Sequence, residues 1–160
     1  LNFPGFGRSA ADYLYVSPFL SNERTENPFQ QADRQFPTDF TYPRHIEYTL
    51  VLQLPEGYDV DERPEDRSVR FLDDAGSFTR MIQVHGNNLT MRATFSLHHP
   101  VIPSNHYEGL RTFFDEVAKA HTEPLVLVKA SGDAEEPSSD DISEATPEED
   151  LSEEGDGSRE

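Results

Sequence analysis

The sequence contains no cysteine and no tryptophan, and only two of its 160 residues are lysine. Without cysteine the chain can form neither disulfides nor sites that need a thiolate, whether as a nucleophile or as a metal ligand. No apolar run approaches the roughly 20 residues that a membrane-spanning helix requires. The formal net charge is −18. A charge of this sign repels nucleic-acid phosphates and anionic lipids, so we expect neither nucleic-acid binding nor membrane insertion.

The negative charge is concentrated at the C-terminal end. Residues 131–160 contain 13 acidic residues against one basic residue, Arg159, and no aromatic side chain. Such a segment buries too little apolar surface to offset the entropy lost on ordering it. Residues 1–130 hold all 17 aromatic residues, which suffice for a hydrophobic core. We therefore predict one folded domain over residues 1–130 and a disordered acidic tail over residues 131–160.

Alternation of apolar and polar residues with a period of two predicts that the domain is built mainly from β-strands. The predicted strands span residues 13–16, 46–54, 69–71, 78–85, 89–98 and 125–128. Short turns rich in glycine, asparagine and aspartate separate the third, fourth and fifth of them, which favours tight hairpins. These three strands should therefore form an antiparallel meander. The stretch from residue 21 to residue 43 is predicted to be an ordered, irregular connection.

A helical pattern interrupts the strands near the C-terminal end of the domain. Apolar residues recur there every three or four positions, which is the spacing of one helical stripe: Tyr107, Leu110, Phe113, Phe114, Val117 and Ala118. We expect a helix from about Asn105 to Ala120 that packs this stripe against a sheet, with a capping box formed by Asn105 and Glu108. The predicted fold is an antiparallel β-sandwich with one C-terminal α-helix, followed by the tail.

The strongest metal-site candidate is a group of three histidines near the start of the predicted helix. His98, His99 and His106 could in principle bind zinc together with an acidic residue. Adjacent residues of a strand point to opposite faces, however, so His98 and His99 cannot both be ligands unless the strand bends there. We interpret all three as surface histidines and predict no metal site.

Acidic residues between positions 59 and 66 could supply a carboxylate pair for glycoside hydrolysis. They are Asp59, Asp61, Glu62, Glu65 and Asp66. A surface this rich in acids always offers such pairs, so we interpret the segment as a solvated turn between strands.

Three further motifs have simpler structural interpretations. Asp73 and Asp74 lie in a turn without the alternating oxygen ligands of an EF-hand, so a hairpin turn is favoured over a calcium loop. Ser104 near His106 lacks an orienting acid and is interpreted as leading into the helix. The glycosylation sequon at residues 88–90 matches by chance. We predict no catalytic, cofactor-binding or metal-binding residues, and therefore a chain that is not an enzyme.

Four phrases occur in an order that resembles the C-terminal domain of bacterial transglutaminase-like proteins. They are NPF at 27–29, DRQFPTDF at 33–40, LPEGY at 54–58 and YEGLRTFF at 107–114, and the resemblance spans about residues 11–130. In those proteins a β-rich domain and a papain-like transglutaminase core precede a small β-domain of unknown function. The resemblance implies an exported, extracytoplasmic bacterial protein. The catalytic residues of that family belong to the preceding core, and none can be assigned here.

The resemblance leads to an expectation about the function of the chain. We expect a non-catalytic accessory domain that docks on, or positions, the papain-like core of the same polypeptide. Aromatic residues crowd the first 42 positions, and we expect Phe19, Phe29 and Phe36 to contribute to that contact. The alternative is a free-standing module that binds glycan or peptide at the cell surface, as many β-sandwiches do. An exposed aromatic platform on a sheet face would favour the glycan module, and an apolar patch near the N-terminal connection would favour docking.

Overall fold

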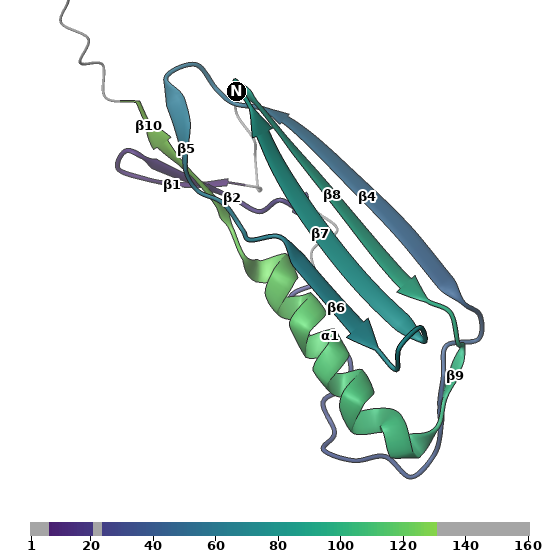
Figure 1. The fold of residues 1–160 in the computed structure, drawn as a ribbon. Helices are drawn as coiled ribbons and strands as arrows, with labels where there is room; N and C mark the ends of the chain where they lie inside the picture. The colour runs from purple at the N-terminus through teal and green to yellow at the C-terminus, as the bar shows by residue number, and fades with distance from the viewer. Residues whose placement is uncertain (1–6, 21–23, 131–160) are drawn as a thin grey trace, which may run out of the picture.

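The computed structural model describes residues 7–20 and 24–130 (Figure 1). The predicted acidic tail, residues 131–160, lies outside the described residues. The predicted fold class is confirmed, because the chain is mainly β, its sheets are antiparallel and one α-helix lies near the C-terminal end. Within the described ranges, no helix is long and apolar enough to cross a membrane.

The larger sheet has four antiparallel strands in the order β4-β8-β7-β6. They are β4 (Arg44–Gln53), β6 (Arg67–Phe71), β7 (Gly76–His85) and β8 (Asn88–Leu97). β6, β7 and β8 follow one another in sequence and form the predicted meander. β4 pairs with β8 over its whole length and lies at one edge of the sheet. The inward face of this sheet carries Phe78, Ile82, Leu89 and Met91, all of which are buried.

The smaller sheet has the order β1-β2-β10-β5. Its strands are β1 (Gly7–Ala10), β2 (Tyr13–Val16), β5 (Tyr58–Glu62) and β10 (Leu125–Lys129). The sequence pattern predicts β2 and β10 but not β1 or β5. The interpretation of the acidic segment as a turn is wrong for Asp59, Asp61 and Glu62, which belong to β5. That strand turns only Tyr58 and Val60 toward the core, so its alternation is too short to be recognised.

Two short elements join the sheets to the helix. β3 (Thr38–Asp39) pairs with β9 (Val101–Ile102), and a 3₁₀ turn, η2 (Ser104–His106), leads into α1 (Tyr107–Thr122). The helix begins two residues later than predicted. The predicted capping box is wrong, because Asn105 lies within η2 and the N-cap of α1 is His106, which makes no side-chain capping bond. The backbone N–H of His106 instead donates to the carbonyl oxygen of Pro103 at 3.0 Å.

The molecule has two layers, with the larger sheet forming one of them. Figure 1 shows α1 lying along this sheet close to β6, with the smaller sheet beyond the end of the helix. Leu14, Leu125 and Leu127 from the smaller sheet join Phe113 and Phe114 from α1 in one hydrophobic core. The helix leaves the inward face of the edge strand β4 incompletely covered.

One charged side chain is fully buried in this core. Arg80 on β7 donates to the carbonyl oxygens of Ala120 and Glu65, and its guanidinium lies 2.5 Å from Glu123 Oε2. Buried charges persist where they are paired and hydrogen-bonded, and Arg80 meets both conditions. The contacts hold the C-terminal end of α1 against the larger sheet.

Candidate functional site

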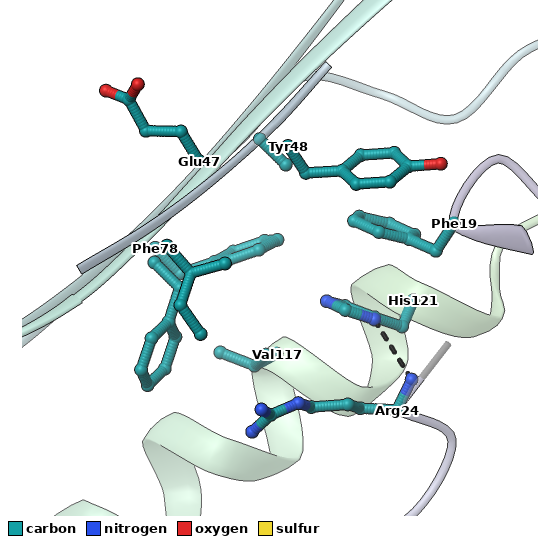
Figure 2. A pocket seen from close by; sticks show the side chains of 10 residues that line it. Phe19, Arg24, Glu47, Tyr48, Phe78, Val117 and His121 are labelled. Carbon is teal, nitrogen blue, oxygen red and sulfur yellow. Dashed lines mark hydrogen bonds between the residues drawn. The ribbon is translucent and has the colours of Figure 1, made fainter. Parts of the chain in front are cut away.

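A cavity of about 360 Å³ lies between the edge strand β4 and the C-terminal half of α1 (Figure 2). Its lining comes from three parts of the chain that are far apart in sequence. Tyr48 and Phe95 come from the sheet, Val117 and His121 from α1, and Phe19 and Arg24 from the segment after β2. The volume lies at the lower end of the range of about 300–1,000 Å³ that is usual for ligand pockets. The cavity exists because α1 lies nearer to β6 than to β4, and Ile46 at its border is 44% exposed.

His121 is the only histidine of the cavity wall, and its surroundings fix its tautomer. The side chain is only 8% exposed, and its ring stacks on Phe19. The backbone N–H of Arg24 donates to Nδ1 at 3.1 Å. A backbone amide can only donate, so Nδ1 must be unprotonated and the neutral ring must carry its proton on Nε2. Figure 2 shows that this second nitrogen points into the cavity.

The surroundings of His121 also keep the ring neutral. Burial lowers its pKa from 6.5 to about 4, and the positive charges of Arg24 and Arg80 act in the same direction. At neutral pH the ring is therefore an uncharged hydrogen-bond donor toward the cavity. Among the described residues, Nε2 has no hydrogen-bond partner.

Two charged residues, Arg24 and Glu47, belong to the lining of the cavity. Figure 2 shows the carboxylate of Glu47 on the far side of β4, directed away from the cavity. The side chain of Arg24 extends along α1 past Val117. Within the part of the chain that the structure describes, its guanidinium forms neither an ion pair nor a hydrogen bond. Arg24, an exposed residue, is therefore the lining residue that brings an unpaired positive charge to the side of α1.

A second candidate surface is the outward face of the smaller sheet. Leu14, Val16, Leu125 and Leu127 face the core. Their sequence neighbours Tyr13, Tyr15, Val126 and Val128 share the opposite face of these strands, where Val126 is only 5% exposed. We call these four residues the tyrosine face. Tyr13 and Tyr15 are 40% and 39% exposed.

Charged residues border the tyrosine face on both sides. Arg8 on β1 pairs with Tyr15, and on the opposite side Glu62 and Asp59 of β5 pair with Val126 and Val128. An apolar centre with a charged rim is the usual composition of a protein–protein contact surface.

The three candidate histidines do not come together at a metal site. His98 contacts Asp74, with Nδ1 2.8 Å from the backbone oxygen, whereas His106 contacts the neighbouring Asn105. Across residues 7–20 and 24–130, no group of three or more His, Asp or Glu side chains is arranged to hold a metal ion.

The other candidate motifs lie in structural elements. Asp73 and Asp74 belong to the turn between β6 and β7, where the amide of Ala75 donates to the carbonyl oxygen of Leu72 at 3.0 Å. Ser104 begins η2, and Asn88 begins β8. Glu65 and Asp66 lie in the connection to β6, and Asp66 accepts a hydrogen bond from the backbone of Ile82 at 2.8 Å.

The three aromatic residues predicted to contact another domain have different positions. Phe19 is 2% exposed and belongs to the core, so its assignment to a docking surface is wrong. Phe29 is partly buried and packs edge-on against Phe114, with ring centroids 5.0 Å apart. The rings of Phe19 and Phe29 thus both pack against side chains of α1. Phe36 is 75% exposed and lies two residues before β3, at the end of the molecule where α1 begins.

Sequence reasoning misses the cavity and the tyrosine face for different reasons. Phe19, Arg24 and His121 meet only because the chain folds back over about 100 positions, and no local spacing reports this. Tyr13 and Tyr15 do carry a signal, since alternate residues of a strand share a face. The pattern alone does not show that this face is the outer one.

Comparison with known proteins supports the family and the fold. A family model described as a domain of unknown function with a solved structure, DUF3858, matches residues 12–127. A solved structure from Parabacteroides distasonis ATCC 8503, described as a "putative protease", is similar with a TM-score of 0.53 and 17% identity. That match covers 61% of this chain and 19% of the other, so it concerns about a fifth of that protein's length. At this identity the likeness concerns the fold alone. No curated protein matches the chain.

Proposed function

The chain belongs to the DUF3858 family, and on this premise we propose that it is a non-catalytic accessory domain of an exported, extracytoplasmic bacterial polypeptide. In this proposal the parent polypeptide is transglutaminase-like. The domain docks on its papain-like core and holds that core in position. The size relationship supports a role within a larger protein, because the similar solved structure is about five times as long as the matched part.

The observation that carries the docking proposal is the place of the tyrosine face, beside β1 at the N-terminal side of the domain. Tyrosine rings are favoured interface anchors, because each buries a large area with few rotatable bonds and keeps a polar tip. Tyr13 and Tyr15 are about 60% covered within this chain, so a second domain would complete their burial. The face suits the modest interfaces, about 600–1,500 Å², that are usual between domains of one chain.

The position of the tyrosine face agrees with a core that precedes this domain. β1 is the first strand described, and it lies directly beside β2, which carries both tyrosines. A preceding core connected through β1 would therefore lie next to this face. Phe36 is exposed and lies two residues before β3, which pairs with β9. Figure 1 shows β9 at the end of the molecule where α1 begins, away from the smaller sheet.

The test compares two double variants in the parent polypeptide. Tyr13→Ser with Tyr15→Ser removes the proposed anchors, and Phe36→Ser with Tyr42→Ser removes two exposed rings from the other end. We expect the first pair to separate the melting transitions of core and accessory domain and to expose the connection to protease, and the second pair to do neither. Unchanged melting in both would contradict docking. Separation by the second pair alone would place the contact at Phe36.

One observation favours a second function, the binding of glycan by a free-standing module. Tyr13 and Tyr15 are alternate residues on one sheet face, and such a flat aromatic pair could stack on sugar rings. The chain lacks tryptophan, so its fluorescence comes from tyrosine. Saturable quenching of this fluorescence by oligosaccharides, lost in the Tyr13→Ser and Tyr15→Ser variant, would favour the glycan module over docking.

A further inference from the structure

We propose that the cavity between β4 and α1 is a binding site for a small carboxylic acid with an apolar, ring-sized body. The body lies between the sheet and α1, and the carboxylate accepts a hydrogen bond from His121 Nε2–H and faces the guanidinium of Arg24. This site is separate from the tyrosine face, so the proposal does not depend on the docking function.

The walls of the cavity determine the apolar part of the ligand. Tyr48 and Phe95 supply ring surface from the sheet, and Val117 supplies a branched side chain from α1. The hydroxyl of Tyr48 is already engaged, since it donates to the carbonyl oxygen of Pro18 at 3.3 Å. This part of the wall therefore offers shape and apolar contact, which suits a ring or a compact aliphatic group.

The polar groups of the cavity determine the other end of the ligand. His121 is more than nine-tenths buried, and its Nδ1 is occupied by the amide of Arg24. The remaining donor of the ring is Nε2–H, which points into the cavity (Figure 2). It has no hydrogen-bond partner among the described residues. A ligand oxygen in the cavity would accept a hydrogen bond from this donor.

The charges select an anionic oxygen over a neutral one. Arg24 and Arg80 both lie close enough to His121 to act on it electrostatically, and Arg80 is already neutralised by Glu123. Arg24 has no such partner in the described part of the chain. Glu47, the acidic residue among the described residues of the lining, directs its carboxylate away from the cavity. An anion that reaches the cavity therefore meets the positive charge of Arg24, which no carboxylate of the described residues pairs with.

The experiment is an NMR titration of the isotope-labelled full chain with phenylacetate, with its neutral analogue phenylacetamide, and with acetate. We expect phenylacetate to shift the resonances of His121, Val117 and Ala93 saturably with a Kd of about 1 mM, in keeping with its small size. Phenylacetamide should bind about tenfold more weakly, as should acetate, which lacks the apolar body.

Arg24→Gln and Arg92→Gln provide a matched pair of variants. Both remove one positive charge, but Arg92 lies on the opposite face of the larger sheet, next to the inward-facing Ala93. Arg24→Gln keeps the backbone N–H that fixes the tautomer of His121. We expect it to weaken phenylacetate binding about tenfold and Arg92→Gln to leave it unchanged. The proposal is overturned if phenylacetate shifts do not saturate, if phenylacetamide binds equally well, or if the two variants behave alike.

Discussion

The ring of Phe19 stacks on the imidazole of His121, with centroids 3.7 Å apart and planes inclined by only 6°. The contact joins the segment after β2 to the last turn of α1. It covers one face of the imidazole with apolar carbon, and burial is the largest cause of the lowered pKa of His121. Phe19 therefore acts inside the domain, as part of the wall that keeps the histidine neutral.

The stability of the domain should fall in acid because of His121. The pKa of this group is about 4 in the folded state and 6.5 ordinarily, so between these values the unfolded chain binds a proton that the folded chain does not. This stability is complete above pH 6.5 and is lost as the pH falls toward 4. The lowered pKa of His121 corresponds to a change of about 3 kcal/mol in the free energy of unfolding. Urea unfolding at a series of pH values measures the loss.

Other groups also titrate in this range, so the effect of His121 is obtained by difference. His121→Gln has no titrating group, and its side-chain oxygen can still accept from the amide of Arg24. We expect the variant to lose about 3 kcal/mol less than the native chain between pH 7 and pH 4. Parallel pH profiles for the two proteins would show that the pKa of His121 is not lowered in the folded state.

Replacing Arg80 with methionine should strongly destabilise the domain. The change leaves the carbonyl oxygens of Ala120 and Glu65 without this donor and removes one of the two arginine partners of Glu123, the other being Arg67. We expect the free energy of unfolding to decrease by about 3 kcal/mol, as in other buried pairs that lose one member. Arg70→Met, at an exposed position of β6, should cost under about 0.5 kcal/mol. Urea titrations that give equal costs would contradict the proposed role of Arg80.

The helix face can be tested with two adjacent substitutions. Phe113 is buried and lies near the rings of Phe71 and Phe95, with centroid distances of 6.0 Å and 5.9 Å. Phe113→Ala should cost about 3–5 kcal/mol, the usual range for a buried phenylalanine. Thr112 is exposed, so Thr112→Ala should cost under about 0.5 kcal/mol. Thermal and urea unfolding would reveal an incorrect helix rotation as similar costs at both positions.

The elements that can be predicted from the sequence are those with long periodic patterns. Strand β8 alternates over ten residues and α1 repeats its stripe over four turns, so the boundaries of both are predicted to within about two residues. β1 and β5 are not predicted, because a strand of four or five residues at a sheet edge turns few apolar side chains toward the core. β1 pairs with β2 across a two-residue turn, whereas β5 pairs with β10 from a distant part of the sequence, which only tertiary contacts can fix.

The candidate site is harder to predict than the fold. The predicted alternation of β7 already places Arg80 on the inward face with Phe78 and Ile82. It cannot show that the partner of Arg80 is Glu123, which follows the helix 43 positions later. The same holds for His121, because its local sequence suggests an ordinary residue of a last helical turn. Only the packing of Phe19 and the amide of Arg24 gives the ring its neutral state and its orientation.

The NPF phrase at residues 27–29 has a structural role that can be tested through Asn27. This side chain is buried, and its Nδ2 donates to the carbonyl oxygen of Arg111 at 2.9 Å and to Asp115 Oδ1 at 2.8 Å. Its Oδ1 accepts from the backbone N–H of Phe29 at 2.8 Å. One amide thus connects the irregular segment before β3 to the exposed side of α1, where few apolar contacts could replace it.

Asn27→Ala should lower the free energy of unfolding by about 1–3 kcal/mol, because buried groups on both elements lose their partner. Asn27→Asp should cost more at neutral pH, since it keeps the acceptor for Phe29 but places a second carboxylate beside Asp115. Gln35→Ala, in the same segment but exposed and without a hydrogen-bond partner among the described residues, should be neutral. Hydrogen exchange at the amide of Phe29 should accelerate in Asn27→Ala, which removes the acceptor, and not in the Gln35 variant. If Asp and Ala at position 27 were equally stable, the contact with Asp115 would contribute nothing, and the segment would be held by the packing of Phe29 alone.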